Sequence, residues 1–133
     1  MIAVDTNVVV RLLTDDDPKQ AAAARSLFEA GPVFIGKTVL LETDWVLRSV
    51  YKLDENAIHD AFTRLFGLKD VHTEDKSAVA AALALTVYGV ELADAIHLTS
   101  RPPGATFVSF DESFLRRAKR AGASDVAAVP VQK

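Results

Sequence analysis

Five short runs that favour strands, most of them apolar, alternate with longer helical stretches, and this alternation constrains the fold of the chain more than any other feature. The runs cover residues 1–4, 33–35, 70–72, 106–109 and 127–131. Runs of this length are typical of strands and too short for ordinary helices. The first run is uniformly apolar and ends abruptly at Asp5, which indicates a central strand that is buried on both faces. We therefore predict an α/β sandwich in which helices surround a central, mostly parallel sheet of four to five strands.

The stretches between the runs carry helix signals. We expect helices over residues 7–13, from Pro18 to near Gly31, from Thr38 to about Tyr51, and over residues 57–66, 76–88, 92–100 and 112–121. Three acids precede Pro18, and this arrangement favours a helix start, because carboxylates suit the N-terminus and proline suits the first turn. Thr38, Asp54 and Thr73 are the predicted N-caps of three later helices. Trp45 and Phe114 are expected in the core rather than on an RNA-binding surface.

Composition narrows the classes of function. The chain has 133 residues and no cysteine, so it fits one domain over residues 1–133 and excludes disulfides, zinc–thiolate sites and thiol nucleophiles. With 15 Lys and Arg against 18 Asp and Glu, it is not a broad basic nucleic-acid binder. The longest uncharged stretch, residues 77–90, is shorter than the roughly 20 residues that cross a bilayer. No signal peptide is expected either, because Asp5 interrupts the first apolar run. We expect a cytoplasmic protein.

Four acids stand where such a fold would place a ligand. Asp5 follows the first run and Asp111 follows the fourth, while Glu42 and Asp94 lie near predicted helix starts. In open α/β sheets, ligands bind beyond the carboxyl ends of the strands, so the fold is what would bring these acids together. A pocket of carboxylates suits Mg²⁺ or Mn²⁺, which can activate water and stabilise the leaving oxygen in phosphodiester cleavage.

Each acid also has a purely structural interpretation. Glu42 and Asp94 lie where helix N-termini favour acids, and Asp111 could cap the helix that follows it. Asp5 closes a strand without an obvious need for a cap, which favours a functional role. Thr6 and Asn7 beside Asp5 could orient it or a metal-bound water, or simply form an Asx-type turn. His97, one helical turn after Asp94, is either a proton relay or a surface or core histidine.

Taken in order, these segments resemble the PIN domain family, and within it the VapC-type toxins of toxin–antitoxin pairs. The resemblance rests on the segments VDTNV at residues 4–8, Glu42, DAIHL at residues 94–98 and SFD at residues 109–111, and it extends from residue 2 to about residue 131. It implies a metal-dependent ribonuclease that uses Mg²⁺, with Mn²⁺ as a plausible substitute.

The resemblance also assigns roles by position. It implies that Asp5 and Asp94 hold the metal most directly, with Glu42 as the middle acid and Asp111 as the last one. Thr6, Asn7 and Ser109 match supporting polar positions. A homodimer and a cognate VapB-like antitoxin follow from the resemblance alone.

Other classes remain as alternatives. An aspartate-nucleophile phosphatase resembling the haloacid dehalogenases would have an aspartate two residues after Asp5, where this chain has Asn7. A response-regulator receiver lacks its acidic pair and its late lysine in register. A non-catalytic PIN-like module that binds RNA or protein is disfavoured because all four acids are present. The basic side chains of Arg116, Arg117, Lys119 and Arg120 either grip phosphates or form a solvated helix face.

Overall fold

The computed structural model describes residues 1–131, within which seven helices and five strands alternate. The helices are α1 (Thr6–Leu13), α2 (Pro18–Ala30), α3 (Lys37–Ser49), α4 (Glu55–Phe66), α5 (Lys76–Thr86), α6 (Leu92–Thr99) and α7 (Glu112–Arg120). The strands are β1 (Ile2–Ala3), β2 (Val33–Ile35), β3 (Val71–Thr73), β4 (Phe107–Ser109) and β5 (Val126–Ala128). The α/β class and the order of the elements are as predicted.

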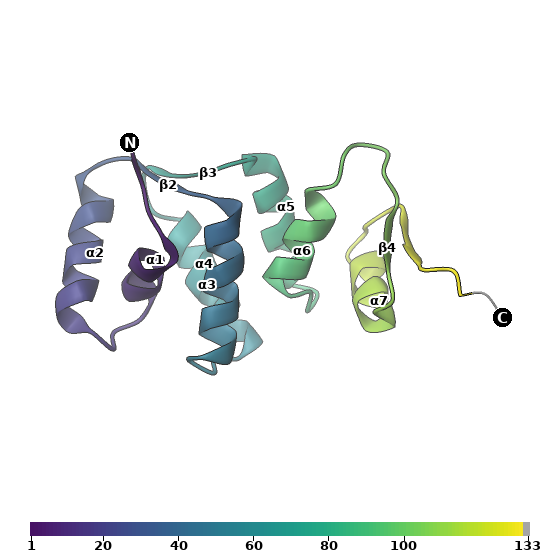
Figure 1. Cartoon of the computed structure of the whole chain (residues 1–133), viewed down its shortest axis with the longest axis horizontal. Helices are drawn as coiled ribbons and strands as arrows, with labels where there is room; N and C mark the ends of the chain where they lie inside the picture. Colours follow the sequence, from purple (N-terminus) through teal and green to yellow (C-terminus); the bar gives the residue numbers. More distant parts are fainter. Residues whose placement is uncertain (132–133) are drawn as a thin grey trace.

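The strands form two parallel sheets, and not the single central sheet that the sequence predicts. One sheet has the order β1-β2-β3, and the other pairs β4 with β5. Figure 1 shows β4 and α7 at one end of an elongated molecule, with α5 and α6 between them and the end that holds α1 and α2. The prediction was wrong in this respect because β1 and β4 do not pair.

The strand β1 is therefore an edge strand, and the expectation of a central strand buried on both faces was wrong. Its Ile2 and Val4 N–H groups donate to carbonyls of Pro32 and Phe34, each at 3.1 Å. Backbone groups of successive strand residues point in opposite directions, so Ala3 faces the free edge. Ile2 is 49% exposed, whereas Val4 belongs to the core.

Packing and hydrogen bonds hold the C-terminal segment, residues 101–131, where it lies. Phe114, Leu115 and Ala118 of α7 are buried in the same apolar core as the side chains of α3 to α6. The Arg101 guanidinium donates to the carbonyls of Ser124, at 2.8 Å, and of Asp125, at 2.9 Å. The buried side chains join α7 to the core, and the Arg101 bonds tie the residues before β5 to the chain that leaves α6.

The helix α3 departs most from the expected pattern of burial. Trp45 is 60% exposed, so its prediction as a core residue was wrong, whereas Phe114 is buried as expected. The buried face of α3 instead carries Leu40, Thr43, Asp44 and Leu47.

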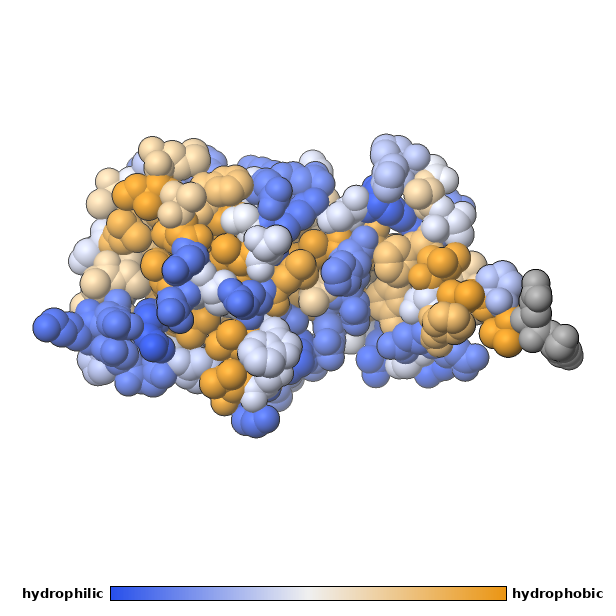
Figure 2. Space-filling model, in the orientation of Figure 1, coloured by the Kyte–Doolittle hydropathy of each residue, from blue (hydrophilic) through white to orange (hydrophobic). Residues whose placement is uncertain are grey.

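In Figure 2, hydrophobic surface is also visible at the end that holds β4, where Val108 and Phe110 are exposed.

Helix starts follow the sequence signals in part. Asp17 and Asp54 cap α2 and α4 with their side chains, as the acids before Pro18 and the prediction for Asp54 suggest. Thr38 and Thr73 are not caps, because α3 begins after Gly36 and α5 begins after Asp75, which adopts a positive φ of 50°. None of the helices within residues 1–131 combines the length and the apolar character needed to cross a bilayer.

Candidate metal centre

The first of the four acids, Asp5, lies where β1 passes into α1. Its carboxylate accepts a hydrogen bond from the Val8 N–H at 3.2 Å and so caps α1. The expectation that Asp5 has no need to act as a cap was therefore wrong, although capping one N–H leaves the carboxylate free to accept other bonds. Its neighbour Thr6 donates its hydroxyl to the carboxylate of Glu42, which links α1 to α3. Both Asp5 and Glu42 are exposed.

The other two acids, Asp94 and Asp111, line one small hollow at the carboxyl end of β4. Asp94 lies in the first turn of α6. Asp111 caps α7 by accepting a hydrogen bond from the Phe114 N–H at 3.0 Å, and its own N–H donates to the Ser109 hydroxyl at 3.0 Å. The hollow has a volume of about 110 Å³ and is lined by Asp94, Phe107, Val108, Ser109, Asp111 and Phe114.

The surroundings of Asp94 disfavour its negative charge. Burial raises the pKa of Asp94 above the ordinary value, and the negative charge of Asp111 raises it further. The positive charges of His97 and Arg48 act in the opposite direction and lower the pKa of Asp94. His97 is exposed one turn after Asp94, so it lies close enough for its charge to reach the carboxylate. A cation in the hollow would relieve the repulsion between the two carboxylates.

The structure does not bring the four acids into one cluster. Asp5 and Glu42 lie near Thr6, whereas Asp94 and Asp111 share the hollow at β4. Across residues 1–131, no three histidine or acidic side chains come together as a group that could hold a metal ion. The separation has a clear cause, because Asp5 and Asp111 follow strands of two different sheets.

The donor set at β4 nevertheless fits a hard divalent cation. Asp94, Asp111 and the hydroxyl of Ser109 offer oxygen atoms only, and Mg²⁺ and Mn²⁺ prefer oxygen ligands. Mg²⁺ commonly uses one or two protein carboxylates and keeps several waters, so this pair suffices for such an ion. Asp5 and Glu42 lie outside this hollow, and Glu42 accepts its hydrogen bond from Thr6, the residue after Asp5.

Two further residues, Asp44 and Arg48, form an ion-pair network near the first turn of α6, which carries Asp94. Asp44 is buried on α3, and it pairs with Arg48 one turn later at 3.2 Å. Arg48 also forms ion pairs with Glu55 of α4 and with Glu91, the N-cap residue of α6. The spacing of Asp44 and Arg48, four residues on one helix, is the only signal in the sequence for this network.

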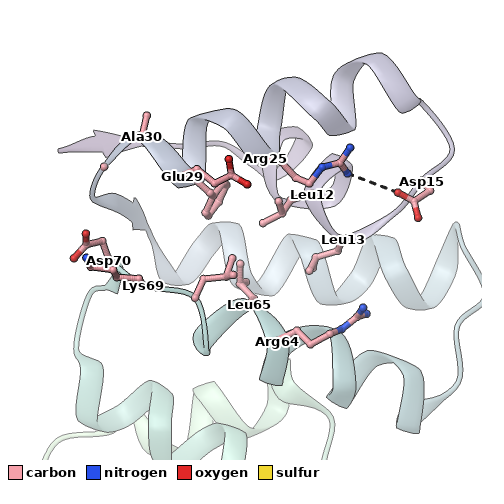
Figure 3. A pocket seen from close by; sticks show the side chains of 13 residues that line it. Leu12, Leu13, Asp15, Arg25, Glu29, Ala30, Arg64, Leu65, Lys69 and Asp70 are labelled. Atoms are coloured by element: carbon pink, nitrogen blue, oxygen red, sulfur yellow. Dashed lines mark ion pairs between the residues drawn. The ribbon is translucent and has the colours of Figure 1, made fainter.

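A larger hollow lies elsewhere on the molecule. It has a volume of about 650 Å³ and is bordered by α1, α2 and α4. Figure 3 shows Arg25 paired with Asp15 at its rim, with Glu29 and Asp70 also at the lining. Its cations and acids balance one another, so its charges favour no particular ligand. None of the four candidate acids lies in it.

Comparison with known proteins places the chain in a family. The model of the PIN domain matches residues 2–120, which is most of the chain. No curated protein matches the chain. PIN domains are generally nucleases, and nucleases of this family generally use divalent metal ions. On the extent of this match, and with the α/β fold described above, the chain belongs to the PIN domain family.

Proposed function

We propose that this protein is a metal-dependent endoribonuclease that cleaves phosphodiester bonds of RNA and acts as the toxin of a toxin–antitoxin pair. The observation that carries the proposal is the pair Asp94 and Asp111, which share one hollow with Ser109 at the end of a parallel strand. Membership of a family of nucleases supports hydrolysis of a phosphodiester. The metal, the RNA substrate and the toxin role belong to the proposal.

The proposal assigns a role to each of the candidate site residues. Asp94 and Asp111 would hold Mg²⁺ or Mn²⁺, and the ion would supply Lewis acidity there. Ser109 fixes Asp111 through the hydrogen bond to its N–H. Asp5 and Glu42, with Thr6 and Asn7 beside them, act as further acceptors and orienting groups on the α1 side.

The basic face of α7 is suited to holding the RNA backbone. Arg116, Lys119 and Arg120 are exposed, and Arg117 reaches back to the Gly89 carbonyl at 3.4 Å. These residues follow Asp111 directly in the chain, so the helix that Asp111 caps also carries the cations. Phosphate contacts from such cations position a nucleic acid without reading its sequence.

The test is cleavage of structured RNA by the pure protein, with Mg²⁺, with Mn²⁺ and with EDTA. We expect cleavage only with a divalent ion, and a loss of cleavage in the double variant Asp5→Asn with Asp94→Asn. The variant Asp60→Asn, which changes an exposed acid of α4 outside the site, is the matched control. Cleavage that persists in EDTA, or in the double variant, would contradict the metal mechanism.

The toxin role requires its own experiment. We expect expression of the chain to arrest growth, and coexpression of a small VapB-like antitoxin encoded beside it to relieve the arrest. We also expect a homodimer that binds this antitoxin, measured by light scattering of the separate and mixed proteins. Growth arrest that the neighbouring product does not relieve would show that the pairing is wrong.

One observation favours a second candidate function. No three acids of the described chain form a metal-binding group, which is what a non-catalytic PIN-like module that binds RNA or a protein would show. The same cleavage assay separates the two candidates when RNA binding is measured alongside it. Binding without cleavage under any divalent ion, across structured RNAs of several classes, supports the non-catalytic module.

A further inference from the structure

Asp44 is the only charged side chain among the buried residues of the described chain, and it belongs to α3, a helix that packs against α6. Only 2% of its surface is exposed. Isolating a carboxylate from water is unfavourable unless partners compensate for the lost hydration. Its partners therefore indicate why it is there.

The two partners of Asp44 lie on different elements. Arg48 of the same helix donates to its carboxylate at 3.2 Å. The backbone N–H of Ala93, the second residue of α6, also interacts with the carboxylate and lowers its pKa, against the larger opposing effect of burial. A residue of α3 thus reaches the first turn of another helix.

The first turn of α6 has no side-chain cap of its own. Its own N-cap residue, Glu91, makes no hydrogen bond from its side chain to the first turn. The first N–H groups of a helix have no partner within the helix, so an acceptor near them stabilises the helix start. No such bond from Asp44 is formed, but its negative charge lies near this turn and complements the helix dipole, and Arg48 pairs both with Asp44 and with the N-cap residue Glu91.

The positive charge of Arg48 offsets the repulsion among three neighbouring carboxylates. Its guanidinium lies among Asp44, Glu55 of α4 and Glu91 of α6, with the Glu91 carboxylate at 3.7 Å. Its Nε is buried and has no hydrogen-bond partner among the described residues. One cation therefore ties three helices together at the point where α6 begins.

Asp94 directly follows Ala93 in the same first turn of α6. The position of that turn determines where the Asp94 carboxylate enters the hollow shared with Asp111. From this geometry, we propose that Asp44 and Arg48 are positioning residues that fix the first turn of α6 and so set the Asp94 carboxylate for metal binding. This inference rests on the proposed function where it concerns the metal.

The first measurement needs no metal. Amide hydrogen exchange of the metal-free protein is compared for the wild type, Asp44→Ala and Leu47→Ala. Leu47 is a fully buried residue on the same helix, so its variant loses packing without touching the charges. We expect the Ala93 amide to exchange about tenfold faster or more in Asp44→Ala, because the first turn of α6 loses the nearby charge and Arg48, which pairs with Glu91, loses its buried partner. In Leu47→Ala, we expect the Ala93 amide to lose no more protection than the fall in global stability of that variant accounts for.

The second measurement is Mn²⁺ affinity by calorimetry, together with kcat and KM for RNA. We expect Asp44→Asn and Arg48→Met to bind Mn²⁺ about 10–100-fold more weakly, as is usual when a group that orients a ligand is lost. Arg48→Lys should recover part of the affinity. Leu47→Ala should bind Mn²⁺ as the wild type does at a temperature where it remains folded.

The two measurements fail in different ways. Unchanged protection of Ala93 in Asp44→Ala would overturn the positioning role, whatever the metal does. Equal loss of Mn²⁺ affinity in Leu47→Ala would also overturn it, because general destabilisation would then suffice. A wild type that binds no Mn²⁺ would contradict the proposed function, while the amide exchange would still decide whether Asp44 holds α6.

Discussion

Asp111 has two candidate roles, as the cap of α7 and as a metal ligand, and three proteins separate them. The wild type is compared with Asp111→Ala, which loses both roles, and with Asp111→Asn. Asparagine caps a helix about as well as aspartate, because its side-chain oxygen still accepts from the N–H of the first turn. The carboxylate is lost in both variants, so both also lose the repulsion with Asp94. The difference between the variants therefore isolates the cap.

The magnitude of the cap follows from the bond that it makes. The Asp111 carboxylate accepts one hydrogen bond, from Phe114 at 3.0 Å. Loss of such a cap costs about 1 kcal/mol. For a chain of 133 residues, an unfolding entropy of about 2.1 cal/mol/K per residue converts this into a fall in Tm of about 3–4 °C. We expect Asp111→Ala to melt lower than Asp111→Asn by this amount when both are metal-free.

Calorimetric melting with and without Mn²⁺ then tests the second role. Binding to the folded state alone stabilises the wild type by about 2.7 kcal/mol at a hundredfold excess over Kd, which is about 10 °C for this chain. We expect both variants to lose most of this rise. If Asp111→Asn kept the full rise, Asp111 would be a cap and nothing more. If Asp111→Asn melted as low as Asp111→Ala, the assignment of the cap would be wrong.

Three other predictions concern charge, anchoring and exposure. The pKa of Asp94 is raised in the folded state, chiefly by burial, so its ionised form lowers stability as pH rises above the ordinary value of 3.8. Metal-free Asp94→Asn should therefore melt above the wild type at pH 7 and level with it near pH 3, and a lower Tm at pH 7 would contradict this. Arg101→Ala should speed amide exchange in β4 and β5 severalfold, because it removes two hydrogen bonds to the carbonyls of Ser124 and Asp125. The control is Arg120→Ala, which changes an exposed arginine. Equal exchange in the two variants would show that the Arg101 bonds do not anchor the strands. Trp45, the single tryptophan, should fluoresce near the wavelength of free tryptophan in both folded and unfolded protein, and a large red shift on unfolding would show that it is buried.

The sequence predicts where helices and strands lie along the chain well, but it predicts poorly which strands pair and which helix faces pack together. Apolar runs and cap signals locate the strands and most helices, because these depend on residues close together in the chain. The pairing of β1 with β2, and not with β4, depends on contacts between residues far apart in the chain, and no local pattern reports them. Trp45 was misplaced for a similar reason, since hydrophobicity alone does not say which face of α3 meets α6.

The candidate site shows the same division. The sequence identifies Asp111 as an acid after a strand and Asp94 as an acid near a helix start, and the structure places them in one hollow. The sequence does not reveal that Asp5 caps α1. An aspartate before a helix can be a cap or a metal ligand, and the sequence alone does not distinguish the two. The role of Asp44 depends on a helix about fifty residues away, so it emerges only from the packing of α3 on α6.

The open edges of the two sheets carry a consequence for solubility. An unpaired strand edge is a template onto which another chain can add a strand, and such addition leads to aggregation. Here each edge strand is very short, since β1 spans two residues and β3, β4 and β5 span three each. A second chain that added a strand to such an edge would form only a few hydrogen bonds. These would offset little of the conformational entropy that the added strand loses. Brevity thus protects this chain in the way that lysines, prolines or bulges protect the longer edges of other sheets.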